Sequence, residues 1–194
     1  MRSRHCHADG GPVPRPSGNA NAKIDDVLVT LPKNYPVFAF LDPYVAELDW
    51  RTIEKLAAHK PMNKIELFIL FACNTGLVRL LPTDPAKLVN AAVLDRVMPD
   101  PEGWRNVYAQ RTHGRVHRQD FRRALLDACV RGLESPGYAF EPPPRLFFTP
   151  DKHPLYFIVF AGDHPVGNKI MQWVFANELG TARQPILLSY DQQY

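Results

Sequence analysis

Hydrophobic residues in the first part of the chain follow two different spacings, and each spacing predicts its own kind of element. From residue 21 to residue 31 the apolar positions recur every three or four residues, which predicts a helix that ends before Pro32. The stretch 37–42 (VFAFLD) is instead a continuous apolar run between two prolines, and 64–72 (KIELFILFA) is a second such run. Runs of this length indicate strands that are covered on both faces.

A helix is expected between these two strands. Asp49 is placed to cap it, and its apolar side then consists of Trp50, Ile53, Leu56 and Ala57. The order helix, strand, helix, strand, with short connections, predicts parallel α/β units.

The middle of the chain has a less regular pattern. Short helices are expected at about 75–81 and 85–97, and a polar, irregular stretch follows around Trp104. A longer helix is expected over about 117–133, where Phe121, Leu125 and Cys129 recur every four residues.

Two apolar runs near the C-terminus predict a β-hairpin. RLFFT (145–149) and LYFIVFAG (155–162) are separated only by PDKHP, a spacing that suits two antiparallel strands. A last helix is expected over about 165–178, and its apolar side is formed by Ile170, Trp173, Val174 and Asn177.

Two parallel strands followed by an antiparallel hairpin resemble the second half of a Rossmann-like sheet of the class I methyltransferase type. The first half would require further βα units, and the residues before 35 hold too few apolar side chains for one convincing strand. We therefore expect a truncated α/β methyltransferase-like domain over 21–180 with its N-terminal half missing. A disordered tail (1–20) precedes it and a C-terminal tail (181–194) follows.

Composition indicates a soluble globular protein, with 45% hydrophobic and 22% charged residues. No apolar run approaches the roughly 20 residues that span a bilayer, and the N-terminus lacks the apolar core of a secretory signal. The cysteines Cys6, Cys73 and Cys129 are too few for a disulfide framework, which favours a reducing cytoplasm. The net charge of +3 permits an anionic partner without requiring one.

Asp42-Pro43-Tyr44 follows the first strand, at the sheet edge where α/β proteins bind ligands. Methyltransferases that act on an exocyclic base amine have an acidic or amide residue, a proline and an aromatic residue at this place. The side-chain oxygen and a neighbouring carbonyl accept hydrogens from the amine, and the ring stacks on the extruded base. The alternative is an ordinary turn, since Asp-Pro is also common turn chemistry after a strand.

Four blocks of the sequence, from about Gly18 to Trp173, resemble the three-Cys-motif partner protein (TcmP) family. FAFLDPYVAELDWRTIEKLA and ELFILFACNTGLVRLL contain the Asp-Pro-aromatic step, a Trp-x-Thr-Ile helix and a Gly-x-x-Arg segment that ends at Arg79. HPLYFIVFAGDHPVGNKIM (153–171) is similar to the closing strand and helix of the family. GNANAKI (18–24) is similar to a Gly-Asp-Ala-Asn step, with Asn19 where Asp is expected.

This resemblance implies S-adenosylmethionine as the methyl donor and a three-Cys-motif protein as the partner. Asp42-Pro43-Tyr44 is then the catalytic segment, Asn19 lies at the cofactor, and Trp50 lies on the substrate side. Arg79 is expected above the sheet near Asp42, where it could hold a phosphate of the substrate or pair with the aspartate; the alternative is an arginine on the surface of a helix. The family also has an N-terminal half with an Asp-x-Phe-Ala-Gly-x-Gly segment, which this sequence lacks. The cofactor pocket is therefore expected to be incomplete, and the resemblance leaves open whether the protein is an active enzyme.

A second hypothesis is a non-catalytic module that binds a protein, DNA or RNA. Six arginines stand against one acidic residue in a short stretch: Arg105, Arg111, Arg115, Arg118, Arg122 and Arg123. Such a run can follow a phosphate backbone, with Trp104 and Tyr108 available for stacking on bases. The alternative is the solvated face of a helix, which also explains a charge cluster of this kind.

The strand at 37–42 is expected to lack a neighbour on one side, because the half-sheet that would flank it is missing. An exposed apolar edge of this kind promotes association. We expect limited stability of the isolated chain, or pairing of this edge with another polypeptide.

His153, Asp163 and His164 flank the last strand and could suggest a metal site or acid–base chemistry. Their spacing is not that of a recognised zinc site. Asp163-His164-Pro165 is better explained as the cap of the following helix, so no metal is expected.

Overall fold

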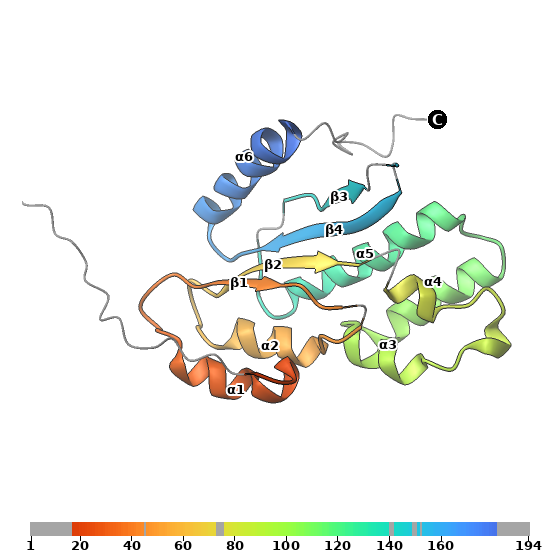
Figure 1. Ribbon diagram of the computed structural model, residues 1–194, viewed down its shortest axis with the longest axis horizontal. Helices are drawn as coiled ribbons and strands as arrows, with labels where there is room; N and C mark the ends of the chain where they lie inside the picture. The colour runs from red at the N-terminus through yellow and green to blue at the C-terminus, as the bar shows by residue number, and fades with distance from the viewer. Residues whose placement is uncertain are drawn as a thin grey trace, which may run out of the picture.

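A mixed four-stranded sheet lies at the centre of the protein, with helices on both of its faces (Figure 1). In this computed structural model the strands are β1 (Phe38–Leu41), β2 (Glu66–Phe71), β3 (Arg145–Phe148) and β4 (Pro154–Ala161), in the order β1-β2-β4-β3. β1 and β2 are parallel, and β4 is antiparallel to both β2 and β3. The expected parallel pair and closing hairpin are thus confirmed, and the protein belongs to the mixed α/β class.

The structure describes residues 17–44, 46–72, 76–139, 142–148, 151 and 153–181. Most of both expected tails, together with Cys6 and Cys73, lies outside these residues. The helices are α1 (Ala20–Thr30), α2 (Trp50–Ala58), α3 (Ala91–Val97), α4 (Pro101–Thr112), α5 (Arg118–Glu134) and α6 (Pro165–Thr181), with short 3₁₀ helices η1 (Leu77–Leu80) and η2 (Pro85–Lys87).

The stretch around Trp104, expected to be irregular, is in fact the helix α4. Its start carries a local signal: Pro101 is the first helical residue, and the Asp100 carboxylate accepts the backbone N–H of Glu102 at 3.0 Å. The polar residues on the outer side of α4 obscured its periodicity. The helix expected over 85–97 is divided into η2 and α3, which are separated by the non-helical residues 88–90.

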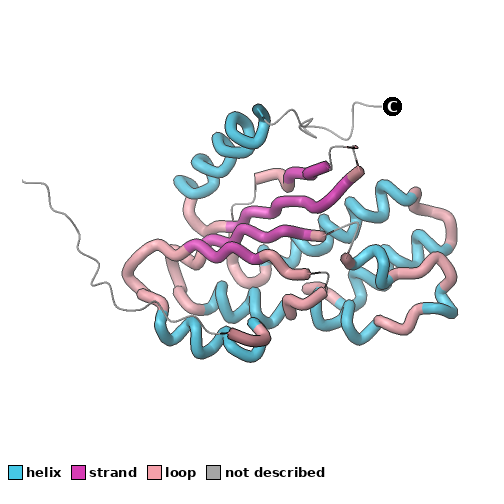
Figure 2. Tube along the Cα trace, in the orientation of Figure 1, coloured by secondary structure: helices cyan, strands magenta, loops and turns pink. Residues whose placement is uncertain are grey.

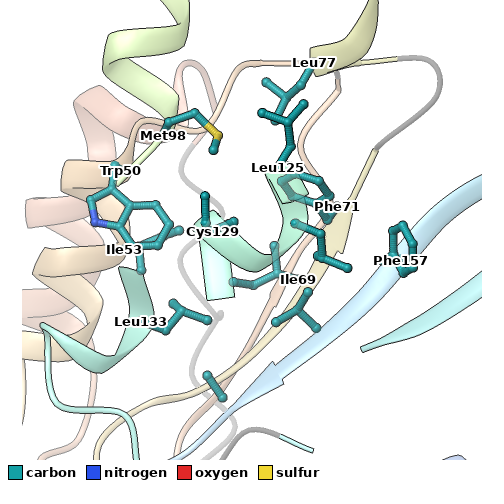
Figure 3. Packing of buried hydrophobic residues seen from close by; sticks show 14 of the residues in the cluster. Trp50, Ile53, Ile69, Phe71, Leu77, Met98, Leu125, Cys129, Leu133 and Phe157 are labelled. Carbon is teal, nitrogen blue, oxygen red and sulfur yellow. The ribbon is translucent and has the colours of Figure 1, made fainter. Parts of the chain in front are cut away.

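Helices α1 to α5 share one hydrophobic core with one face of the sheet (Figures 1 and 2). Figure 3 shows Trp50 of α2 and Cys129 and Leu133 of α5 packed near Ile69 and Phe71 of β2. Cys129 is 6% exposed, which confirms that it is a core thiol. We call this side of the sheet the covered face.

The opposite face carries α6, which packs against β4, β3 and part of β2 through a smaller cluster of apolar side chains. Phe175 is buried there, and Met171 and Val174 are partly buried beside it. The apolar side expected for α6 was therefore only partly right, because Ile170 and Trp173 are 55% and 58% exposed.

Phe38 and Phe40 of β1 lie on the same side of the sheet as α6 and are 51% and 58% exposed. Their rings contact Phe68 of β2, with centroids 5.9 and 5.6 Å apart. We call the surface formed by these three phenylalanines the open face. β1 is also the outermost strand on its side of the described sheet, which agrees with the expected exposed edge.

Candidate functional site

A pocket of about 870 Å³ lies at the carboxyl end of β1. Three parts of the chain form its walls: the start of α1, the end of β1 with the loop that follows, and one side chain of α3. The lining residues are Gly18, Asn19, Ala20, Asn21, Ala22, Phe40, Leu41, Asp42, Pro43, Ala46, Glu47, Leu48, Asp49 and Arg96. Asn19 is thereby brought together with Asp42 and Pro43, although more than twenty residues separate them in sequence.

Asp42 and Pro43 occupy the end of the strand directly, since β1 stops at Leu41. Asp42 is exposed and Pro43 is half-buried. Tyr44 is 76% exposed and is not among the residues that line the pocket. Its ring is thus accessible to a planar group from solvent.

Asn19 also has a local role, because it caps α1. Its Oδ1 accepts the backbone N–H groups of Asn21 and Ala22 at 2.9 and 3.4 Å. The oxygen is therefore engaged in the cap, and the amide nitrogen is the group through which Asn19 can contact a ligand.

Asn21 fixes the shape of the pocket, and the sequence analysis missed this residue. Its Nδ2 donates to the carbonyl of Glu47 at 2.6 Å, and its Oδ1 accepts the N–H of Asp49 at 2.9 Å and the hydroxyl of Thr52 at 2.7 Å. The start of α1 is thus tied to the loop after β1 and to the first turn of α2. Its partners lie 26 to 31 residues away, so no local pattern could have identified them.

Asp49 precedes α2, but the expected side-chain cap is not formed. Its carboxylate instead pairs with the guanidinium of Arg96 from α3. Arg96, like Asn21, lines the pocket and was not indicated by the sequence. Arg96 thus adds a cation to a pocket that Asp42 and Glu47 also line.

Trp50, expected on the substrate side, is a core residue with 6% exposure. Its ring lies so close to Gly132 of α5 that a Cβ at Gly132 would be 2.9 Å from the ring atom Cζ2. Arg79, in η1, is exposed and is not among the lining residues of the pocket. The structure therefore does not bring either side chain to Asp42.

The arginine stretch is divided between several environments. Arg111 donates to the carbonyl of Leu81 at 3.2 Å and lies 4.5 Å above the ring of Phe121, so it connects α4 to its neighbours. Arg115 is exposed, and Arg122 is half-buried. Arg118 is the first residue of α5, and its side chain lies outside the described part of the structure.

The expectation that Trp104 and Tyr108 are available for stacking is wrong. Trp104 is 0% exposed, and its Nε1 donates to Asp95 Oδ1 at 3.0 Å. Tyr108 is 6% exposed, and its hydroxyl donates to the carbonyl of Pro82 at 2.7 Å. The hydrogen bond from Arg105, above all, lowers the pKa of Asp95, so this carboxylate stays charged beside the indole.

A second pocket, of about 740 Å³, lies at the amino ends of β1 and β2. Burial raises the pKa of Glu66 there, and the negative charge of Asp163 adds to the rise. Asp163 accepts the backbone N–H of Lys64 at 2.8 Å, whereas His164 Nδ1 accepts the N–H of Val166 at 3.2 Å. The capping role expected for this segment is therefore carried by the ring of His164.

The first pocket lies where the resemblance would put S-adenosylmethionine. Asn19 could offer its amide nitrogen there, and Phe40 and Leu41 supply apolar surface. Gly18 is the only glycine among the described lining residues, and no strand of the described sheet leads into it. These residues fit part of the cofactor, and the glycine-rich turn of a complete site is not among them.

Together these features define a mixed α/β protein with a pocket of polar and apolar residues at the carboxyl end of β1. No family model matches the chain, and neither a curated protein nor a solved structure matches it. Within the described ranges, no cluster of three His, Cys, Asp or Glu side chains could hold a metal ion. No helix in the described part of the chain is long and apolar enough to cross a bilayer.

Proposed function

We propose that the protein is a truncated, TcmP-like methyltransferase relative that binds S-adenosylmethionine and presents Asp42-Pro43-Tyr44 to an amine of a nucleic-acid base. The observation that carries this proposal is the pocket that joins Asn19 to Asp42 and Pro43. The resemblance assigns the first of these residues to the cofactor and the other two to the substrate. A methyl donor and an amine must meet in one pocket for transfer to occur.

The arrangement of the sheet supports the same proposal. One parallel pair is followed by a hairpin whose last strand, β4, lies between β2 and β3 and is antiparallel to both. A class I methyltransferase sheet ends with such a hairpin. Ligands of open α/β sheets bind beyond the carboxyl ends of the parallel strands, which is where the pocket lies.

The protein's own side chains are assigned to orient the substrate. The exposed carboxylate of Asp42 accepts hydrogens of the amine and so aims the nitrogen lone pair into the pocket. Tyr44, at 76% exposure, stacks on the base that carries the amine. S-adenosylmethionine, when bound, supplies the electrophilic methyl group.

Titration of S-adenosylmethionine into the purified chain, followed by calorimetry, tests the cofactor half of the proposal. Saturable heat is expected for the wild type and for Asp42→Ala, because Asp42 is assigned to the amine. Asn19→Ala should weaken binding but also removes the cap of α1. Asn19→Asp is the matched variant, because Asp caps a helix as well as Asn does but lacks the amide nitrogen. Weaker binding by this variant as well would assign the loss to the amide and not to the cap.

Transfer of a labelled methyl group to DNA or RNA tests the substrate half. Asp42→Ala should abolish transfer, and Asp26→Ala, an exposed acid on α1, should not change it. An absence of saturable heat from the wild type would contradict the proposal. Binding of nucleic acid without cofactor, with an affinity that falls steeply as salt is added, would favour the non-catalytic module instead.

A further inference from the structure

The outer edge of β1 carries backbone groups that no neighbouring strand of the described sheet takes up. The carbonyl of Val37 accepts the N–H of Glu66 at 2.9 Å, so the backbone groups of Val37, Ala39 and Leu41 point toward β2. Because these groups alternate along a strand, the N–H and C=O of Phe38 and Phe40 point away from the sheet. These two residues thus form an edge that can accept another strand.

The same two residues also present their rings to solvent on the open face, at 51% and 58% exposure. Other exposed apolar residues, such as Val89, stand outside the sheet edge and offer no row of backbone donors and acceptors. Polar backbone groups and apolar rings therefore coincide at one place on the described surface. A strand that pairs there would form hydrogen bonds with the backbone groups and cover the rings.

The sequence of β1 is complementary to itself when reversed. Residues 37–41 read Val-Phe-Ala-Phe-Leu, with Ala39 at the centre of the run. We propose that two copies of the chain pair through β1 in antiparallel orientation, with a two-fold axis at Ala39. Phe38 of one copy then lies opposite Phe40 of the other, and each such pair exchanges both of its backbone hydrogen bonds.

The charges around β1 favour antiparallel over parallel pairing of two copies. Lys33 is exposed on the side where β1 begins, and Asp42 is exposed where it ends. An antiparallel pair places the basic end of one copy beside the acidic end of the other, whereas a parallel pair would oppose like charges. Pro36 has no N–H, so the pairing stops before it and is limited to the self-complementary run.

Sedimentation velocity on the full chain tests this dimer. The wild type is expected to sediment with about twice its monomer mass of 22.0 kDa. Phe38→Lys combined with Phe40→Lys should give the monomer, because charged side chains oppose each other across the axis. Trp173→Lys is the matched control: it changes an aromatic residue of 58% exposure on α6, away from the edge, and should leave the dimer intact.

A cysteine at Ala39 tests the register. On the axis, Ala39 faces its own copy in a pair without backbone hydrogen bonds, at a Cα separation of about 4.5 Å, which a disulfide can span. In a background with Cys6→Ser and Cys73→Ser, Ala39→Cys should form a covalent dimer under mild oxidation, and Val29→Cys, 87% exposed on α1, should not.

Three results would overturn the proposal. One is a monomer at all concentrations, which would mean that another segment of the chain covers the edge. The second is a dimer that survives the double lysine substitution, and the third is a dimer that Ala39→Cys does not cross-link. The mass of the wild type and the Ala39→Cys cross-link involve no substitution of a residue that lines the first pocket, so they test the dimer separately from the proposed function. Phe40 does line that pocket, so the double lysine variant is not used to measure cofactor binding.

Discussion

The two faces of the sheet differ in how completely the chain covers them. On the covered face, Leu67 and Ile69 of β2 and Val159 of β4 are at most 4% exposed beneath α5 and its neighbours. On the other side α6 packs over β4 and β3 and over part of β2, and the phenylalanines of β1 are half exposed. Since apolar burial supplies about 25 cal/mol per Å², the covered face stabilises the fold and the open face retains apolar surface for association.

The largest expected difference in stability is between substitutions of two phenylalanines, one buried in the core of the covered face and one exposed on the open face. Phe121→Ala, at 0% exposure on α5, should lower the free energy of unfolding by about 3–5 kcal/mol, because it leaves a cavity in the core. Phe40→Ala on the open face should cost less than about 1 kcal/mol in the monomer. Urea denaturation at two protein concentrations measures both and separates any contribution from association. Equal costs would mean that the open face is not open in solution.

A second, smaller difference in stability is expected between alanine substitutions of two helical glycines, one on each side of the sheet. A Cβ at Gly132 of α5 would lie 2.2 Å from Pro99 Cβ and 2.9 Å from the Trp50 ring, neither of which can move aside easily. Gly132→Ala should therefore destabilise the protein by about 1–3 kcal/mol, despite the better helix propensity of Ala. A Cβ at Gly167 of α6 meets Glu66 Oε1 at 2.1 Å, the end of a flexible side chain. Gly167→Ala should be close to neutral, and a matching loss in thermal stability for both variants would contradict this difference.

Loss of the hydrogen bond between Trp104 and Asp95 should lower the free energy of unfolding by less than Gly132→Ala does. Asp95→Ala leaves the buried indole N–H without its acceptor and should cost about 1 kcal/mol, the lower end of the range for such groups, because Asp95 is partly exposed to water. Asp95→Asn keeps an oxygen that can accept the bond and should retain most of the stability. Unfolding curves followed by tryptophan fluorescence measure the difference. The same loss from both variants would show that the charge, and not the hydrogen bond, matters.

The smallest effect concerns Glu66, whose pKa is raised above its ordinary value of 4.5. The folded state then holds this proton more tightly than the unfolded state, so ionisation of Glu66 lowers stability as the pH rises from about 4.5 through the raised pKa. Glu66→Gln cannot ionise, so it should equal the wild type in stability at acid pH and exceed it slightly at neutral pH. Chemical denaturation across this pH range measures the gain. A difference that does not change with pH would argue that burial of the carboxylate is not the cause.

Much of the secondary structure could be predicted from the sequence because its signals are local. The apolar runs of β1 and β2, the prolines beside them and the short linker between β3 and β4 indicated a parallel pair and a hairpin without knowledge of the rest. The prediction failed at α4, where two local signals disagreed. The polar residues indicated an irregular stretch, whereas Asp100-Pro101 is a typical helix start.

The candidate site could be predicted only in part. Asp42 and Pro43 follow a recognisable strand, so their place at its carboxyl end was expected. That Asn21 holds the loop and that Asp49 pairs with Arg96 depends on segments brought together by folding. The burial of Trp50 and Trp104 was decided in the same way, since Trp50 lies against Gly132 of α5 and Trp104 donates to Asp95 of α3.

The sequence by itself thus determined which segments become strands and helices, because hydrophobic period, prolines and caps act over a few residues. Only the tertiary structure decided that β4 lies between β2 and β3, that one pocket joins Asn19 to Asp42, and that Phe38 and Phe40 remain exposed. The physical reason is that burial and hydrogen bonding of a side chain depend on its neighbours in space. Those neighbours come from parts of the chain that no local pattern connects.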